Sequence, residues 1–298
     1  MILLIRRLLA LLPMGFRIAL GRSLGYLYSL FPTRDRKVAE LQMRMCLGAD
    51  YNAQNIKRMF SSLGQSVMEC FDLDYYLNDV EKHIDCPTWK VATDVKNGTK
   101  PIIVLSAHTG NWDLLAGYTI ARGIKVSTIA RRARNKYLQV LLEKIRSLYG
   151  IDTIWKEDKN STRLIARCFK SNGVLAALID QDISVDSEYV NFFGMPAKYP
   201  AGLIALAKKS NSHIIAAFIF RERNGRYKVY LHNIDNSKEV KEILVEYSEL
   251  LENYIRMYPD QWVWFHKRWR SIEGGKKYSG GEYVRFLENY EKENTKTA

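Results

Sequence analysis

The segment Pro101–Gly123, PIIVLSAHTGNWDLLAGYTIARG, constrains the fold more than any other part of this chain. Residues Ile102–Leu105 form an unbroken apolar run with two Ile and one Val, which is typical of a strand covered on both faces. Gly110 permits a sharp turn, and Asn111 is a good N-cap for a helix that follows it. Gly123 suits the position just after the end of that helix. The segment therefore predicts a strand, a tight turn and a helix.

His108 and Asp113 lie on either side of that turn. On one continuous helix, positions five apart would be roughly 140° around the axis at about 3.6 residues per turn, and the two side chains could not meet. A chain reversal can bring them together if His108 precedes the cap and Asp113 lies in the first helical turn, where the helix dipole favours a carboxylate. An imidazole held by a carboxylate at one nitrogen can take a proton at the other. The pair is a candidate base with its orienting carboxylate. The alternative is a structural histidine followed by a capping aspartate.

Apolar strands alternate with amphipathic helices after Pro101, as in proteins with a parallel sheet covered by helices. Asn224 and Gly225 form a strong hairpin signal between two later strands, so the sheet should also contain an antiparallel pair. We therefore expect an α/β fold with a mixed, mostly parallel central sheet flanked by helices. The expected strands are 102–105, 125–130, 174–179, 213–220 and 227–233, and the expected helices include 52–77, 112–122, 136–149, 161–170, 239–257 and 282–293.

Residues Met1–Phe31 are apolar and aromatic, but Pro13 would kink or restart a helix there. Arginines also interrupt the segment, at Arg6, Arg7, Arg17 and Arg22. No stretch reaches the ~18 uncharged apolar residues of a confident spanning helix, and no small-residue cleavage site suggests a signal peptide. Such a helix typically lies in the membrane interface; the alternative is a helix packed on the globular core. We divide the chain into a membrane-associating helix, residues 1–32, and a single α/β domain, residues 33–298.

The formal net charge of +13 predicts an anionic partner: phospholipid headgroups, an acidic carrier protein or nucleic acid. Nucleic acid is the weakest of these, because the basic residues are scattered and no zinc knuckle, RNP-like string or helix-turn-helix signature occurs. The four cysteines show no CxxC pair and no ligand spacing, so we expect reduced thiols in a cytosol-facing protein and no metal site. GxxxxGK[ST], GxGxxG and HExxH are absent, which leaves nucleotide, dinucleotide and zinc-protease chemistry without a basis.

The string HTGNWD resembles the HX4D/E motif of the lysophospholipid acyltransferase superfamily, and its NW resembles the lipid A late acyltransferase branch of that superfamily. Three later segments occur in the order of that branch: LIDQD at 178–182, FFGMPAKYPAGLIALAKKSNSHII at 192–215 and YPDQWVWFHKRWR at 258–270. The resemblance extends from the N-terminal helix to about Arg270. The mycobacterial phosphatidylinositol mannoside acyltransferase belongs to the same wider family, so the resemblance leaves the acceptor open.

The resemblance implies that a fatty acyl group moves from acyl carrier protein or coenzyme A to a hydroxyl of a lipid A precursor or related anionic glycolipid, without a bound cofactor. The expected place is the cytoplasmic face of the bacterial inner membrane. His108 would act as the general base, and Asp113 would orient it and stabilise the imidazolium. The alternatives are acylation of a lysophospholipid or a mannosylated inositol lipid, and a membrane-associated lipid-binding protein without turnover. Ser106 is a weak nucleophile candidate, because no GxSxG elbow occurs.

Seven further residues are expected to bind substrate: Asn111, Arg131, Arg132, Arg146, Asp180, Gln181 and Asp182. Arg131 and Arg132 follow an apolar strand and could clamp phosphates; a solvated basic turn is the alternative. Arg146 matches, by resemblance, a family arginine close to the active-site carboxylates. Asp180 and Asp182 lie at the C-terminal end of a strand, where ligands of open α/β sheets bind, and by resemblance Asp182 is the one expected to complete the site.

An aromatic and basic cluster, WVWFHKRW, occupies residues 262–269. It fits an interfacial belt, in which indoles lie at headgroup depth beside cations. It fits equally well a strand of core tryptophans that alternate with exposed charges. The sequence leaves both interpretations open.

Overall fold

The computed structural model describes residues 8–9, 11–96, 100–133, 135–171, 173–272, 274 and 277–295. A seven-stranded sheet forms the centre of the molecule, in the order β1-β9-β8-β2-β5-β3-β4. Strands β8 and β9 are antiparallel, and the other neighbouring pairs are parallel. The expected mixed, mostly parallel sheet is therefore confirmed. Its strands are β1 (Ile84–Asp85), β2 (Ile102–Ser106), β3 (Val126–Ala130), β4 (Asp152–Trp155), β5 (Val174–Leu178), β8 (His213–Arg221) and β9 (Tyr227–Ile234).

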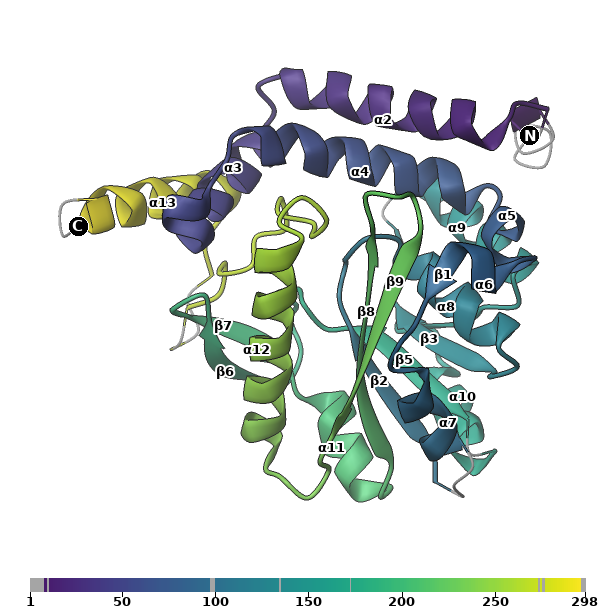
Figure 1. Cartoon of the computed structure of the whole chain (residues 1–298). Helices are drawn as coiled ribbons and strands as arrows, with labels where there is room; N and C mark the ends of the chain where they lie inside the picture. The colour runs from purple at the N-terminus through teal and green to yellow at the C-terminus, as the bar shows by residue number, and fades with distance from the viewer. Residues whose placement is uncertain are drawn as a thin grey trace.

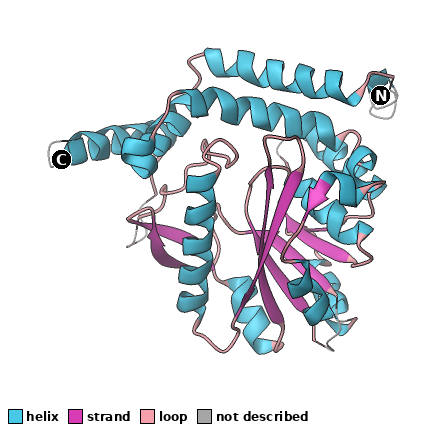
Figure 2. Ribbon diagram, in the orientation of Figure 1, coloured by secondary structure: helices cyan, strands magenta, loops and turns pink. Residues whose placement is uncertain are grey.

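Helices cover both faces of this sheet, as the alternation of strands and helices in the sequence predicted (Figures 1 and 2). The helices are α2 (Met14–Leu30), α3 (Arg34–Leu47), α4 (Gln54–Cys70), α5 (Asp74–Leu77), α6 (Val80–His83), α7 (Trp89–Lys96), α8 (Trp112–Ala121), α9 (Lys136–Leu148), α10 (Ser161–Lys170), α11 (Gly202–Lys209), α12 (Val240–Met257) and α13 (Gly280–Thr295), with a short 3-10 turn η1 (Gly48–Asp50). A separate hairpin, β6 (Ser187–Phe192) with β7 (Met195–Pro200), packs beside α12.

Several local signals produce the expected boundaries. Pro13 is the N-cap of α2, and the side chain of Asn111 caps α8 by accepting a bond from the Leu114 N–H. Gly123, just after α8, has a φ of 80°, a conformation that costs glycine little. The helix expected over 52–77 is wrong in length, because α4 ends at Cys70 and the Phe71 N–H bonds back to the Met68 carbonyl in a tighter turn.

The alternation of side chains along the strands divides the interior into two main cores. In β2, Ile103 and Leu105 join one core with α3, α11, α12 and the β6–β7 hairpin. Ile102 joins the second core with α7, α8 and α9. Strands β3 and β5 are different, because most of their residues are only partly buried on either face. A central parallel strand is normally covered on both sides, so this pair marks an opening in the core.

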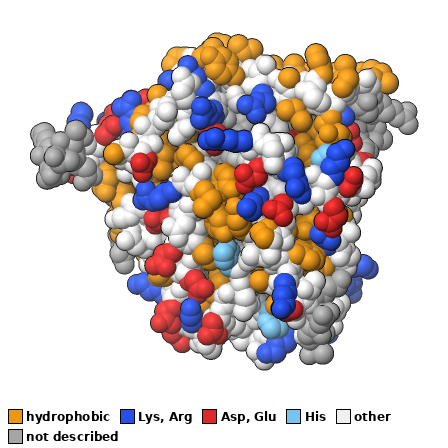
Figure 3. Space-filling model, in the orientation of Figure 1, with side chains coloured by type: hydrophobic (Ala, Val, Ile, Leu, Met, Phe, Trp, Pro, Cys, Tyr) orange, Lys and Arg blue, Asp and Glu red, His pale blue; other side chains and the backbone are white. Residues whose placement is uncertain are grey.

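Helix α2 runs alongside α4 on the outside of the molecule (Figure 1). The two helices approach closely: a Cβ on Gly21 would come within 2.5 Å of the Gly64 carbonyl oxygen, and one on Gly25 would overlap the Phe60 carbonyl. The outer face of α2 is apolar and exposed, and Figure 3 shows hydrophobic side chains along this edge. None of the described helices is long and apolar enough to cross a membrane. Residues 1–7 and 10 of the predicted membrane-associating segment lie outside the described residues.

The C-terminal edge of the sheet faces α4. Arg221, at the end of β8, donates to the hydroxyls of Ser62 and Ser66 on α4, at 2.9 Å and 3.1 Å. The Ser66 hydroxyl in turn donates to the Gly110 carbonyl, just beyond the end of β2. The order of layers at this edge is therefore sheet, α4, then α2.

Candidate active site

A cavity of about 700 Å³ extends along β2, β3 and β5. Its walls are mainly apolar and include Val104, Ala176 and Leu178 from the strands and Leu115 from α8. His108, Asp113, Arg146 and Gln181 contribute polar groups to the same lining. The partly exposed strands β3 and β5 thus border an apolar space with a polar end.

His108 is held by Asp180. The imidazole Nδ1 lies 2.8 Å from Asp180 Oδ1, and the His108 backbone N–H donates to Asp180 Oδ2 at 3.0 Å. The indole N–H of Trp262 donates to the same Oδ2 at 2.8 Å. Asp180 is 1% exposed, and burial alone would raise its pKa; the charge and hydrogen bonds of His108, with the bond from Trp262, outweigh burial and hold the pKa below its usual range. Asp180 is therefore a buried carboxylate that orients the imidazole.

Asp113 has a different partner from the one expected from the sequence. Its Oδ1 accepts from Arg146 Nε at 2.8 Å, and both side chains are about nine-tenths buried. Asp113 does lie in the first turn of α8, where its charge is favoured. Arg146 therefore pairs with the carboxylate that the sequence assigned to His108, and the carboxylate beside the imidazole is Asp180, just beyond the end of β5.

Gln181 and His266 surround the free side of the imidazole. The Gln181 amide nitrogen lies 3.1 Å from His108 Nε2 and 2.7 Å from His266 Nε2. Burial, with the nearby His108, lowers the pKa of His266 to about 3, so its ring is neutral and can accept the amide bond. The same amide nitrogen lies 3.2 Å from His108 Nδ1, so it lies over the face of the imidazole, and the Nδ1 proton is directed to the Asp180 carboxylate. This arrangement fixes the tautomer that leaves Nε2 as the basic nitrogen.

Asn111 and Asp182 do not reach the cavity. Asn111 is 1% exposed; its oxygen caps α8, and its amide nitrogen donates to Glu69 Oε2 at 3.0 Å. Asp182 accepts instead from the backbone N–H and hydroxyl of Ser271, at 2.6 Å and 2.9 Å. Both side chains are thus engaged in structural bonds, and Asp180 rather than Asp182 lies beside His108; the roles of Asn111 and Asp182 toward a substrate stay predictions.

The two adjacent arginines after β3 have different surroundings. Arg131 lines the cavity, and its Nε lies 3.7 Å from a Glu157 carboxylate oxygen. Arg132 pairs with Glu143 at 2.7 Å and Asp158 at 2.8 Å on the surface. Of the predicted pair, Arg131 thus lines the cavity, whereas Arg132 forms exposed ion pairs.

Residues 262–269 contribute to the site through buried contacts. Trp262, Trp264 and Trp269 are at most 2% exposed, which excludes an interfacial belt. The segment is a loop rather than a strand, and Arg268 is fully buried over the Tyr199 ring instead of exposed. Sequence reasoning missed Trp262 and His266 as site residues. The only signal for them was their proximity to one another in a family-like segment.

The arrangement combines a base, a fixed tautomer and an apolar cavity. His108 is 19% exposed, enough for a substrate atom to reach its ring. Ser106, the weak nucleophile candidate, donates its hydroxyl to the Ala217 carbonyl at 2.6 Å, as expected for a packed side chain. The geometry suits removal of a proton from a hydroxyl held at the polar end of the cavity, with an apolar chain along the strands.

Comparisons with known proteins identify a family model and several relatives that match this chain. The family model described as "Bacterial lipid A biosynthesis acyltransferase" matches residues 1–271. The phosphatidylinositol mannoside acyltransferase of Mycobacterium tuberculosis is 21% identical over 165 residues, 54% of this chain and 52% of that protein. The protein of the same name from Mycolicibacterium smegmatis is also 21% identical, over 54% of each chain. The chain therefore spans about half the length of the curated relatives it matches.

Proposed function

We propose a function from one premise: the chain belongs to the bacterial lipid A biosynthesis acyltransferase family. It is an acyltransferase, and we infer that it moves a fatty acyl group from a thioester to a hydroxyl of an anionic glycolipid, with His108 as the general base. The observation that carries the proposal is the His108–Asp180 pair, at 2.8 Å, at the polar end of an apolar cavity.

The shape of the cavity suits a long acyl chain. Its lining includes both Ile102 and Ser106, the two ends of β2. Four residue steps at about 3.3 Å each make this wall roughly 13 Å long, before the turn that carries His108. An acyl chain in this space would cover the partly exposed residues of β3 and β5, and burial of apolar surface would stabilise the complex.

The proposed step needs no enzyme nucleophile. The acceptor hydroxyl loses its proton to His108 Nε2 as its oxygen attacks the thioester carbonyl carbon. Asp180 stabilises the imidazolium that forms. The tetrahedral intermediate then collapses, the C–S bond breaks, and the imidazolium returns its proton to the departing thiolate. The products are an ester and a free thiol.

Arg146 and Asp113 supply the second charged pair of the cavity. We propose that Asp113 fixes the guanidinium through Nε, so that the other N–H groups of Arg146 can bind a phosphate or a developing oxyanion. In this assignment the carboxylate of the HX4D motif holds the arginine rather than the histidine.

For the acceptor, we propose a lipid A precursor or a related anionic glycolipid, with a phosphatidylinositol mannoside as the alternative because the mycobacterial relatives carry that name. A lysophospholipid acceptor is retained as a further outcome of the assay. The donor is acyl carrier protein or coenzyme A; Arg131 and Lys156, which line the cavity, are candidate contacts for the anionic groups of either.

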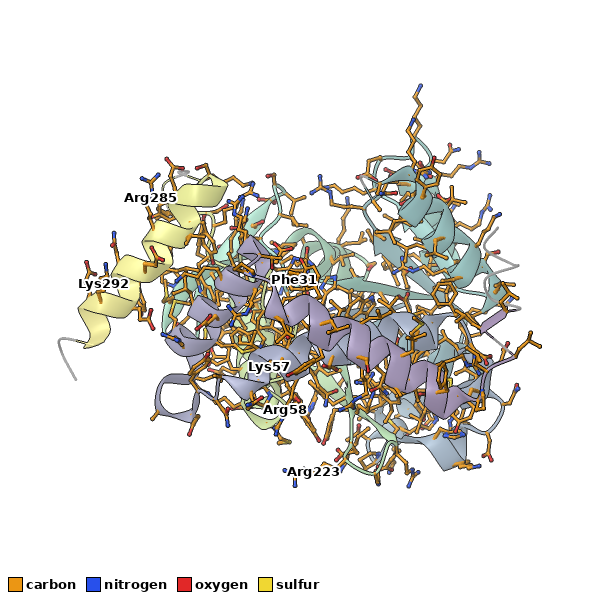
Figure 4. All side chains as sticks on the ribbon, turned by 90° about the horizontal axis from the view of Figure 1, so that it is seen from above. Phe31, Lys57, Arg58, Arg223, Arg285 and Lys292 are labelled. Carbon is orange, nitrogen blue, oxygen red and sulfur yellow. The ribbon has the colours of Figure 1, made fainter. Side chains whose placement is uncertain are left out.

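We also propose that the protein works at the cytoplasmic face of the inner membrane, docked through α2. Exposed apolar side chains, including Phe16, Leu24 and Leu27, cover the outer face of this helix. Figure 4 looks onto α2 and shows Phe31 at its end, with Lys57 and Arg58 on the neighbouring helix. Apolar side chains flanked by cations suit the boundary of an anionic bilayer.

The activity is tested with His108→Ala. We expect purified parent protein to transfer acyl groups from acyl carrier protein or coenzyme A thioesters to glycolipid, as followed by mass spectrometry. The variant should lose transfer by at least 10²-fold while it still binds the lipids. Equal transfer by variant and parent would refute the base assignment. Lipid binding without turnover in the parent would favour a lipid-binding protein.

The membrane assignment is tested by sedimentation with vesicles that contain anionic lipid. Leu24→Glu and Leu27→Glu, on the exposed face of α2, should release the protein into the supernatant. Val245→Glu, an exposed apolar position on α12, is the matched control and should leave sedimentation unchanged. Retention of the α2 variants on the vesicles would argue against docking through this face.

A further inference from the structure

A buried ion pair lies behind the turn that carries His108. Glu69 on α4 is fully buried, and its Oε2 lies 3.1 Å from Arg221 Nη2 at the end of β8. Tyr227 donates to the same oxygen, while Tyr76 and Gln65 donate to Oε1 at 2.7 Å and 2.8 Å. Burial alone would raise the pKa of Glu69, but the charge of Arg221 and these bonds lower it. The carboxylate is thus ionised and surrounded by donors.

This carboxylate contacts the turn through Asn111. The Asn111 amide nitrogen donates to Glu69 Oε2 at 3.0 Å, and its oxygen accepts from the Leu114 N–H at 3.0 Å. Both ends of the Asn111 amide are therefore fixed, one by α4 and one by the first turn of α8. Because Asn111 stands between His108 and Asp113 in the chain, its orientation sets the backbone that links the two side chains.

A second contact from α4 holds Gly110, the residue before Asn111. The Ser66 hydroxyl donates to the Gly110 carbonyl at 2.9 Å, and Arg221 Nη2 donates to the Ser66 hydroxyl. Gly110 has a φ of 51°, and a Cβ there would come within 2.4 Å of the Ile219 carbonyl oxygen. The turn is therefore pressed against β8 and held from α4 at two consecutive residues.

We propose that Glu69 is a positioning residue for acyl transfer: through Asn111 it holds the HTGNWD turn so that His108 and the Asp113–Arg146 pair face the same end of the cavity. This inference rests on the proposed function. Neutral groups could fill the space at a lower desolvation cost, whereas a carboxylate provides shorter and stronger bonds to the turn. Small displacements of a reacting group lower rates steeply, so a turn held in this way favours turnover more than substrate binding.

The test exchanges the hydrogen-bond donor and acceptor between positions 69 and 111. Glu69→Gln should lower kcat at least tenfold and change the KM for either substrate by less than about threefold. Asn111→Asp keeps the cap to Leu114 but places a second carboxylate against Glu69, so kcat should fall further. In the Asn111→Asp background, Glu69→Gln should raise kcat at least tenfold, because the amide of Gln can donate to the new carboxylate. A change that harms the parent would then rescue the variant.

A readout independent of catalysis separates this inference from the proposed function. The rings of His108 and Trp112 have centroids 5.0 Å apart, so selectively labelled protein should show a nuclear Overhauser contact between them. The contact should weaken in each single variant and return in the double variant. If the parent transfers no acyl group but the contact follows this pattern, the proposed function fails, while the conclusion that Glu69 holds the HTGNWD turn through Asn111 stands. The inference is overturned if the variants lose only thermal stability, with kcat per folded molecule and the ring contact unchanged, or if Glu69→Gln fails to rescue Asn111→Asp.

Discussion

Replacement of Asp180 by Asn tests the catalytic geometry with a change of one atom. Each Asp180 oxygen now accepts from N–H groups: Oδ2 from the His108 backbone and Trp262, and Oδ1 from His108 Nδ1. An asparagine oxygen can replace Oδ2 and keep two of these bonds. Its amide nitrogen then faces His108 Nδ1, which must give up its proton and accept. The imidazole proton moves to Nε2, and the nitrogen that should receive the acceptor's proton is no longer basic.

The expected loss follows from this change of tautomer. An Asp to Asn change that leaves a catalytic histidine in the wrong tautomer costs on the order of 10⁴ in kcat, and we expect 10³–10⁴ for Asp180→Asn. The free energy of unfolding should fall by roughly 1–3 kcal/mol, because one charge-assisted bond is lost in a buried place. Acyl transfer would be followed by mass spectrometry, and the tautomer by the ¹⁵N shifts of His108.

Asp182→Asn is the matched control, since its carboxylate bonds to Ser271 rather than to the histidine. It should leave kcat within about threefold of the parent, because no reacting group changes its protonation. If Asp180→Asn retains more than a tenth of the parent's kcat, or if the His108 tautomer is unchanged, the assignment of Asp180 as orienting carboxylate is refuted. A large loss with Asp182→Asn instead would favour Asp182, the carboxylate that the resemblance predicts to complete the site.

Three further predictions concern stability and the second charged pair. Arg146→Met leaves Asp113 unpaired and nearly buried, so the free energy of unfolding should fall by about 3 kcal/mol and acyl transfer should fall with it. Arg132→Met, which breaks exposed ion pairs, should leave the urea unfolding midpoint nearly unchanged. The pKa of His266 is lowered to about 3 from its ordinary 6.5, so its neutral ring stabilises the fold above pH 6.5, and that contribution is lost as the pH falls from 6.5 toward 3. Over this range the free energy of unfolding of the parent should fall by up to about 1.4 kcal/mol per pH unit more than that of His266→Gln. Equal dependence of the two unfolding free energies on pH would contradict this prediction. Gly25→Ala should separate α2 from α4 and lower the free energy of unfolding by about 1–3 kcal/mol. Gly15→Ala, where the added Cβ meets open space, is the control and should leave the thermal unfolding temperature unchanged or slightly raised.

Much of the fold can be predicted from the sequence, because the local patterns of most strands and helices agree with the structure that they adopt. The helix expected over 161–170 and the hairpin around Asn224 and Gly225 occur where their periodicity and turn residues placed them. No sequence pattern predicts β1, β4, α7, α11 or the β6–β7 hairpin. β1 and β4 are only two and four residues long, too short for a periodic signal, and they are ordered by pairing with β9 and β3.

Less of the site can be predicted from the sequence, because the side chains that contact one another there come from distant parts of the chain. His108 and Asp113 are five residues apart, and the turn between them together with the family resemblance predicts that they pair. Asp180 approaches from the end of β5, a parallel neighbour of β2, so its contact with His108 depends on strand order, which no local pattern reports. Trp262 and His266 arrive from a loop held by Gln42 through the carbonyls of Trp264 and His266. The division of the chain at residue 32 and the catalytic roles stay predictions.

The position of the site explains why the outer helix matters to the proposed chemistry. In a parallel sheet the side chains that follow the strands gather at the C-terminal edge. Here that edge lies beneath α4, and α2 lies on the other side of α4. Phe60 of α4 connects the layers: its ring contacts Tyr28 of α2 and stacks on Phe265, next to His266 of the site. A bilayer against the exposed face of α2 would therefore lie on the same side of the protein as His108. If this geometry is correct, variants that release α2 from vesicles should slow acylation of lipid in a bilayer much more than acylation of the same lipid in detergent micelles.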